Sequence, residues 1–315
     1  MKIVDMHCDT IVEMYNTNQH LDSNNLHIDL EKMRKGDYLL QNMAIFLDCR
    51  QVNQMPKVAK DIINFYNKET SINNINRVYK YSDIKTNQIN TMLTIEDSAI
   101  VPYQELEEFH NLGVRMITLT WNYINSVGYP NLDGDNLKTR ADLRRVDNLN
   151  GLKPHGINYV KKMEDLNMII DVSHGSNKLV EDVLFNTKKP FVASHSNCFS
   201  VTKVGRNLND SLLEKLIQRE CVIGINFCSE FISDRNDSVS TIEDIIKHID
   251  YMLDFGGENS IGFGADLDGI NSELEIKDSS NMQEIVNALE KRYSKSLVKK
   301  ICSENVLSMY QKVLQ

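Results

Sequence analysis

The sequence predicts an α/β fold, a closed (β/α)8 barrel of the TIM type. Short apolar or β-branched runs recur along the chain, and segments with helical spacing lie between them. Several runs are apolar at consecutive positions, as expected of parallel strands that are buried on both faces. Strands that alternate with helices indicate a parallel sheet. Because the runs number eight, a closed barrel is favoured over an open sheet.

The predicted strands lie near residues 2–6, 39–47, 91–95, 114–120, 168–173, 190–194, 221–227 and 260–265. Among the segments between them, residues 102–112 begin with Pro102 and end before Gly113, which are ordinary start and stop signals of a helix. Residues 122–150 lack periodicity and contain glycine and proline, so they predict a long loop. On the carboxyl side of a barrel, such a loop contacts substrate.

Further helices are predicted in the second half of the chain. Residues 176–186 follow Ser176, a favourable N-cap. Residues 240–255 begin with the run from Ser240 to Glu243, which fits a capping box. The tail from about 281 to 314 has helical spacing and predicts more helix.

Composition restricts the class of protein. The chain has 315 residues, of which 41% are hydrophobic and 25% charged, as in a soluble protein with a large core. Barrels of this length form one unit, so we expect a single barrel domain over residues 1–315. The net charge of −9 argues against nucleic-acid and acidic-membrane partners, which favour a basic face.

The N-terminus and the cysteines predict the compartment. The first residues turn polar after four positions, unlike a signal peptide, and no stretch approaches the roughly 18 apolar residues of a membrane span. The six cysteines are dispersed without a C-x-x-C pair, so we expect free thiols in a reducing compartment. These features predict a cytoplasmic protein that is not associated with a membrane.

Side chains that can bind metal ions follow the predicted strands directly. In chain order they are His7, Asp9, Glu96, His174, His195, Asp266 and Asp268. In a barrel the carboxyl ends of all strands converge on one face, where active sites form. We therefore expect these side chains to share one site.

The residue types and their spacing predict a centre for two metal ions. His7 and Asp9 are two positions apart, so in an extended chain both side chains point the same way and can bind one ion. Glu96 comes from another strand and can bridge two ions, which leaves His174 and His195 for the second ion. Imidazole and carboxylate ligands suit zinc or another divalent ion. Two such ions generate hydroxide near neutral pH and polarise a substrate carbonyl.

Other candidates have simpler structural explanations. A second His-x-Asp pair, His27 and Asp29, precedes a helix-like segment in which Asp29 fits an N-cap. Cys8 alternates with the proposed ligands and Cys198 lies past its strand, so burial is expected for both thiols. Surface or core roles suffice for the remaining histidines, which are His20, His110, His155 and His248.

Short motifs occur in a specific order along nearly the whole chain. They are Asp5-Met6-His7-Cys8-Asp9, His27-Ile28-Asp29-Leu30 followed by Gly36 and Gln41, Thr94-Ile95-Glu96, residues 113–120, Ile170-Asp171-Val172-Ser173-His174, Ser194-His195-Ser196-Asn197, Arg206-Asn207-Leu208 and residues 262–269. In this combination the chain resembles the membrane (renal) dipeptidase family, zinc metallopeptidases with an amidohydrolase-like barrel. The resemblance implies two Zn2+ per chain, with ligands that agree with those expected from the strand ends: His7, Asp9, Glu96, His174 and His195.

The resemblance also implies how a substrate is held and cleaved. Arg206 would bind the free C-terminal carboxylate of a dipeptide, which a planar guanidinium fits well. Asp266 would transfer the proton, so that Asp266 and Glu96 are the expected catalytic residues. The chain resembles a bacterial-type cytoplasmic member, because the secretion and lipid-anchor signals of the membrane-bound members are not seen. The expected partner is a small-molecule dipeptide, and the sequence is compatible with a homodimer.

Two positions depart from the pattern of the family. Trp121 stands where the renal enzymes carry a His that contacts the substrate carbonyl, and Asn122 or Asn125 is the alternative donor. Cys228 stands where a substrate-contacting Tyr is expected. The expected substrate-binding residues are therefore Arg206, Trp121, Asn122 and Asn125.

Two other functions share these features. The same metal centre could open a cyclic amide or remove an N-acyl group, since one fold supports many chemistries. A non-catalytic barrel that binds a ligand would differ by at least one broken ligand position. No such break is seen at the five expected metal ligands.

Overall fold

A computed structural model describes residues 1–235 and 237–315. Eight parallel strands form a closed ring, because β2 pairs with both β1 and β4. The ring consists of β1 (Ile3–Asp5), β2 (Tyr38–Phe46), β4 (Asn90–Glu96), β5 (Val114–Thr118), β6 (Ile169–Asp171), β7 (Val192–Ala193), β8 (Val222–Ile225) and β10 (Ile261–Phe263). Each strand falls within or beside a predicted run, so the (β/α)8 prediction is confirmed.

Three additional strands were not expected from the sequence. β3 (Asn76–Arg77) pairs with β4 outside the ring, while β9 (Val239–Ser240) and β11 (Glu273–Leu274) form a separate parallel pair. Each has two residues, which is too short to show an alternating pattern. The longest pairing is between β2 and β4, from Leu40 opposite Asn90 to Phe46 opposite Glu96.

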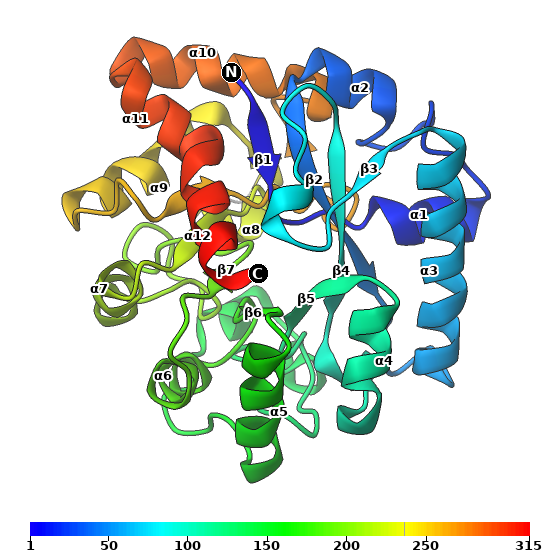
Figure 1. The fold of residues 1–315 in the computed structure, drawn as a ribbon. Helices are drawn as coiled ribbons and strands as arrows, with labels where there is room; N and C mark the ends of the chain where they lie inside the picture. The colour runs from blue at the N-terminus through cyan, green and yellow to red at the C-terminus, as the bar shows by residue number, and fades with distance from the viewer. Residues whose placement is uncertain (236) are drawn as a thin grey trace.

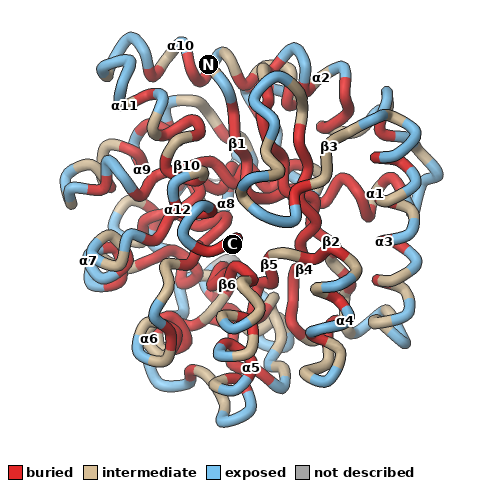
Figure 2. Tube along the Cα trace, in the orientation of Figure 1, coloured by how far each residue is buried: buried red, intermediate tan, exposed pale blue. Residues whose placement is uncertain are grey.

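Helices surround the ring (Figure 1). They are α1 (Thr10–Thr17), α2 (Leu30–Lys35), α3 (Met55–Ile72), α4 (Leu106–Asn111), α5 (Pro154–Asp165), α6 (Asn177–Asn186), α7 (Asp210–Gln218), α8 (Ser229–Ile232), α9 (Ile242–Asp254), α10 (Met282–Arg292), α11 (Lys295–Lys299) and α12 (Asn305–Val313). Figure 2 shows buried positions concentrated on the strands and on the inner sides of these helices, with exposed positions on their outer sides. This is the layering expected of a barrel with one core inside the ring and one around it.

Several helix boundaries differ from the predicted ones. Residues 103–105 form a 3-10 turn before α4 begins at Leu106. The capping box of α9 joins Thr241 to Asp244, one position later than predicted, because Ser240 belongs to β9. The predicted tail is divided into three helices, with an extended break at Tyr293 and a π-helical turn over Lys300–Glu304. The predicted N-cap Ser176 is confirmed by its hydrogen bond from the backbone N–H of Leu179.

Helix α12 closes the amino end of the barrel. Its residues Val306, Met309, Tyr310 and Val313 pack in one cluster with buried side chains of the strands, among them Val192 and Val222. A Cβ on Gly262 would lie 2.9 Å from Val306, so the close approach of the helix requires glycine there. In Figure 1 the helix crosses the viewer's side of the ring. With that end sealed, the opposite, carboxyl end is the open one.

The long loop after β5 lies at the carboxyl end, as predicted. Residues 122–150 contain two 3-10 turns, Gly134–Asn136 and Arg140–Arg144, and isolated β-bridges at Gly128 and Pro130. The backbone N–H of Asn131 donates to the carbonyl of His174 over 2.7 Å, which attaches the loop to the end of β6. In the described part of the chain, no helix is both long and apolar enough to span a bilayer.

Candidate metal centre

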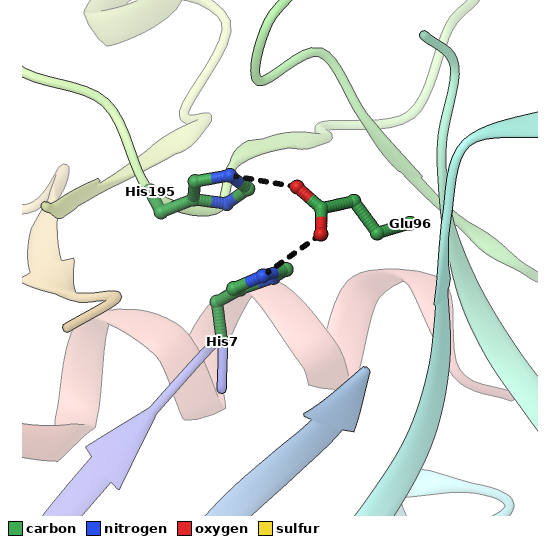
Figure 3. Close-up of side chains that lie close together, drawn as sticks. All are labelled: His7, Glu96 and His195. Carbon is green, nitrogen blue, oxygen red and sulfur yellow. Dashed lines mark ion pairs between the residues drawn. The ribbon is translucent and has the colours of Figure 1, made fainter. Parts of the chain in front are cut away.

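The expected metal ligands meet at the carboxyl end of the barrel. His7 and Asp9 follow β1, Glu96 is the last residue of β4, and His174 and His195 follow β6 and β7. All five side chains are buried. Figure 3 shows three of them pointing toward one another from different strands.

Glu96 lies in the middle of this group. Its Oε2 is 3.5 Å from Nε2 of His7, while its Oε1 is 3.0 Å from Nε2 of His174 and 3.4 Å from Nε2 of His195. The two carboxylate oxygens therefore face different imidazoles (Figure 3). This is the arrangement that a carboxylate bridging two ions requires.

The first half of the centre is formed around His7. Its Nε2 lies 3.5 Å from Oδ2 of Asp9 and 3.8 Å from Oδ1 of Asp266. Regular strand pairing stops at Asp5, and Cys8 continues it by a single bridge to Leu267. The side chains of His7 and Asp9 still share one side, while the Cys8 thiol donates to the carbonyl of Asn42 over 3.3 Å.

The second half consists of two imidazoles whose outer nitrogens are fixed. Nδ1 of His174 lies 2.9 Å from Oδ1 of Asn122, and Nδ1 of His195 lies 2.7 Å from Oγ of Ser194. Hydrogen bonds at Nδ1 leave the Nε2 atoms free to bind a metal. Those two Nε2 atoms face each other across 2.9 Å. His174 also has a positive φ of 66°, a strained conformation of the kind found at functional sites.

Burial and mutual charge govern the protonation of this group. Burial raises the pKa of Glu96 to about 7 and the pKa of Asp266 to about 6. Burial alone would lower the pKa of His7, but the carboxylates of Glu96 and Asp9 outweigh it and raise that pKa. For His195, burial and the neighbouring charges of His7 and Arg206 lower the pKa well below its usual value.

The residues present fit divalent metal ions. Nε2 of His7 and Oδ1 of Asp9 are buried and have no hydrogen-bond partner in the described protein. Two groups of possible ligand atoms lie within 4.8 Å of one another, His7 with Glu96 and His195, and His7 with Asp9 and Asp266. With the proton of each ring on Nδ1, the Nε2 lone pairs of His174 and His195 face each other and repel, and a cation would relieve that repulsion. Imidazole nitrogens with carboxylate oxygens are the donor set of zinc and similar ions.

A cavity of about 520 Å3 opens over these residues. Its lining includes the metal-centre residues Asp9, Glu96, His174 and Asp266, the expected substrate residues Trp121 and Asn122, and also Cys228, Phe46, Glu13 and Phe231. Trp121 packs against Phe46, with ring centroids 4.6 Å apart. One wall of the cavity is therefore aromatic, and the floor is the metal centre.

The two candidate asparagines have different surroundings. Asn122 lines the cavity, but its Oδ1 accepts from His174. Asn125 is absent from the described cavity lining, and both ends of its amide hold the loop: Nδ2 donates to Asp97 and Oδ1 accepts from the N–H of Val127. Its sequence neighbourhood could not reveal this, because loop hydrogen bonds depend on the folded path of the chain.

Arg206 is buried beside the centre. Its Nη1 donates to the carbonyl of His195 over 3.0 Å, and its guanidinium carbon lies 4.5 Å from the ring centroid of Phe231. The Nε and Nη2 donors are buried without a hydrogen-bond partner in the described protein. Burying such donors is costly unless a ligand accepts from them.

The residues expected to be structural have structural contacts. Asp29 caps α2 by accepting from the N–H of Lys32 over 2.8 Å. Cys198 is buried with its thiol 3.7 Å from the carbonyl of His248. Sequence reasoning did not single out the buried Asp5 and Asp171, although each precedes a histidine by two or three residues, a spacing that could have identified them.

Fold and site together define a class. Buried histidines and carboxylates gathered at the open end of a (β/α)8 barrel are typical of a metal-dependent hydrolase. Over residues 1–315 the chain matches the model of the membrane dipeptidase family (peptidase family M19), and it belongs to that family. It is thus a metallo-dipeptidase, a hydrolase that acts on peptide bonds.

Two relatives each match two thirds or more of the chain. The chain is 32% identical over 215 residues to a Klebsiella pneumoniae protein encoded in the pqqA 5' region, covering 67% of this chain and 77% of that protein. It is 28% identical over 310 residues to an uncharacterized dipeptidase of Schizosaccharomyces pombe, covering 91% of this chain and 72% of the relative.

Solved structures show the same fold. The M19 metallopeptidase dipeptidase AC has a TM-score of 0.88 at 21% identity, covering 100% of this chain and 99% of that one. A metallopeptidase from Rhodobacter sphaeroides, liganded with a phosphinate mimic of the dipeptide L-Ala-D-Ala, has a TM-score of 0.85 at 20% identity, covering 99% of both chains.

Proposed function

We propose that this protein is a two-zinc dipeptidase that cleaves dipeptides with a free C-terminal carboxylate. The observation that carries the proposal is the position of Glu96, whose two oxygens face different imidazoles, beside an arginine with unused donors. The first feature supports two ions. The second supports an anionic group on the substrate.

Five residues would hold the ions. His7 and Asp9 serve one, His174 and His195 serve the other, and Glu96 lies between them. When bound, the ions supply a nucleophile near neutral pH and polarise the scissile carbonyl. The hydrogen bonds at Nδ1 of His174 and His195 orient both rings for this task.

Asp266 is proposed to carry the proton. Its Oδ2 accepts from Nδ2 of Asn226 over 2.9 Å, which leaves Oδ1 directed toward His7 and the centre. In this position the carboxylate accepts a proton from the attacking water and delivers it to the departing amine. Asp266 also has a positive φ of 62°, a strained conformation of the kind found at functional sites.

Arg206 is proposed to bind the C-terminal carboxylate. Nε and Nη2 are unpartnered and adjacent on one edge of the guanidinium, which matches the two oxygens of a carboxylate. The Nη1 bond to His195 and the packing on Phe231 fix the plane of the group. The aromatic wall at Trp121 then faces substrate side chains.

A substrate panel tests this function. Zinc-loaded protein is assayed by HPLC with L-L and L-D dipeptides, each as free acid and as C-terminal amide, and with cyclic and N-acylated amides. The L-D set is included because the Rhodobacter sphaeroides relative was liganded with a mimic of L-Ala-D-Ala. We expect turnover of free-acid dipeptides and at least about 100-fold lower kcat/KM for the amides, since a buried arginine is left unpaired. Equal turnover of acids and amides would refute the role of Arg206.

The cysteines support the proposed location. All six are free, and five of them are buried. We propose that the protein works in the cytoplasm, where thiols remain reduced.

A further inference from the structure

Asp171, the last residue of β6, lies fully buried under the second pair of histidines. Its Oδ1 accepts from the backbone N–H of Ser173 over 3.0 Å and from that of Ser194 over 2.8 Å. Its Oδ2 accepts from the hydroxyls of Thr118 and Ser194, each over 2.6 Å. One carboxylate thus joins the ends of β5, β6 and β7.

The same construction occurs under the first half of the centre. Asp5 is the last residue of β1, and its Oδ1 accepts from the N–H of His7 and from the N–H of Ala265, each over 3.1 Å. Each aspartate therefore accepts hydrogen bonds from the N–H two residues later in the chain and from an N–H at the end of the neighbouring strand. The two sites differ in two ways. Of the two aspartates, only Asp171 also accepts hydrogen bonds from side-chain hydroxyls. Nδ1 of His195 has a hydrogen-bond partner, whereas Nδ1 of His7 has none in the described protein.

The hydroxyl of Ser194 sets the direction of a hydrogen-bond chain. A carboxylate only accepts, so the single proton of this hydroxyl is donated to Asp171. The Ser194 oxygen must then accept from Nδ1 of His195, 2.7 Å away. The proton of the imidazole is thereby placed on Nδ1, and the lone pair of Nε2 faces Glu96 and His174.

We infer that Asp171, acting through Ser194, is a positioning residue for the second metal ion. It fixes the tautomer and the ring orientation of His195, and it holds the turn that presents His174. The inference rests on the proposed function, because it takes His174 and His195 as ligands of one ion. Partners of this kind typically alter metal affinity 10- to 100-fold.

The chain offers a matched control. Thr118 donates to the same oxygen of Asp171 at the same distance, but the described structure gives its hydroxyl no contact with a histidine. Thr118→Val and Ser194→Ala each remove one buried hydroxyl and one hydrogen bond to Asp171. The Ser194 hydroxyl also contacts the Ser173 hydroxyl over 3.3 Å, so Ser194→Ala can cost more stability than Thr118→Val. A purely structural role predicts that neither change selectively weakens the second metal ion, whereas positioning predicts this effect for Ser194→Ala alone.

The metal-free protein and both variants are titrated with Co2+ alone, followed by visible absorption, and their metal content is measured after desalting. We expect two ions in the wild type and in Thr118→Val. In Ser194→Ala we expect the second dissociation constant to rise about 10- to 100-fold with the first unchanged. Thermal unfolding of the metal-free proteins measures the stability cost of each change separately from metal binding.

Two results would overturn the inference. If the wild type binds two ions and Ser194→Ala binds the second as tightly as Thr118→Val does, the inference fails while the proposed function stands. If the wild type binds only one ion, the two-ion proposal fails and takes the inference with it. As a measurement without variants, 15N NMR of the metal-free protein should show the proton of His195 on Nδ1, and a proton on Nε2 would also contradict the inference.

Discussion

Arg206 is buried, and its Nε and Nη2 donors have no hydrogen-bond partner in the described protein. We therefore expect a large contribution of Arg206 to substrate binding. Arg206→Met should lower kcat/KM for a free-acid dipeptide by about 100- to 10,000-fold, because two hydrogen bonds to a charged group contribute about 1.5–3 kcal/mol each. For the amidated dipeptide the loss should be far smaller, since that substrate lacks the carboxylate. Steady-state kinetics on both substrates measure the difference.

Arg50 is a matched control for this change. It also lies over an aromatic ring, 4.7 Å from the centroid of Tyr123, but it is exposed and pairs with Asp135 on the surface. Arg50→Met should leave the acid-to-amide preference unchanged. A similar loss of preference in both variants would show that Arg206 acts through general charge and not by binding the carboxylate.

At the scale of elements, the two His-x-Asp pairs differ in what their aspartates contact: Asp9 lies beside His7 in the candidate metal centre, whereas Asp29 caps a helix. Asp29 caps α2 and also accepts from the N–H of Asn24 and from the Lys32 ammonium. Asp29→Ala should lower the free energy of unfolding by about 1–2 kcal/mol, as N-cap removal does, and should keep the full metal content. Urea unfolding and metal analysis test this, with Asp9→Ala as the comparison that should lose metal. Loss of metal from Asp29→Ala would contradict the structural role.

The helices after β8 are connected by an uncharged histidine. His248 in α9 donates from Nε2 to the carbonyl of Ile232 in α8, and its Nδ1 accepts from the N–H of Cys198. Burial lowers the pKa of His248 to about 4. Between pH 6.5, the usual pKa of histidine, and pH 4, the unfolded chain binds a proton that the folded chain excludes, so stability falls as the pH falls.

This linkage gives a measurable slope. The His248 contribution should decrease by about 3 kcal/mol in total from pH 7 to pH 4. Urea unfolding at several pH values, compared between the wild type and His248→Gln, isolates it, because all other groups titrate in both proteins. Parallel pH profiles would mean that folding does not lower the pKa of His248.

Helix boundaries show what local sequence can and cannot determine. Ser176 was predicted correctly as an N-cap because its own neighbours supply the hydrogen bond. The box at α9 shifted by one residue because Ser240 pairs with β11, a contact from a distant part of the chain. Likewise, Asn125 had the chemistry of a substrate donor, and only the folded loop assigns its amide to Asp97 and Val127.

For the whole molecule, bound metal should be a major source of stability. The centre concentrates buried carboxylates and imidazoles, and ions that bind only the folded state stabilise it by mass action. At a free concentration about 1,000 times the dissociation constant, one ion adds about 4 kcal/mol. Chelation should therefore lower the unfolding temperature by about 10 °C, measured by calorimetry with and without EDTA. A His7→Ala, His195→Ala double variant is the control and should show little change; an equal midpoint for wild type with and without metal would contradict the prediction.

The barrel and the position of the candidate metal centre were predictable because both follow from the repeated alternation of strands and helices. Strand ends converge in any closed parallel barrel, so His7, Glu96 and His195 could be grouped from their places in the sequence. The cap at the other end was not predictable in this way. The local sequence does not show that α12, and not α10, covers the amino end of the barrel. This position depends on the space beside Gly262, which only the folded barrel forms.

That cap also fixes an order of events during synthesis. Helix α12 follows β10 in the chain, so all eight strands emerge from the ribosome before the helix that covers their amino ends. Until it arrives, the apolar residues of that end, Val192 and Val222 among them, face water. A nascent chain stalled between β10 and α12 should consequently expose an apolar surface to chaperones while the residues proposed to bind metal are already translated.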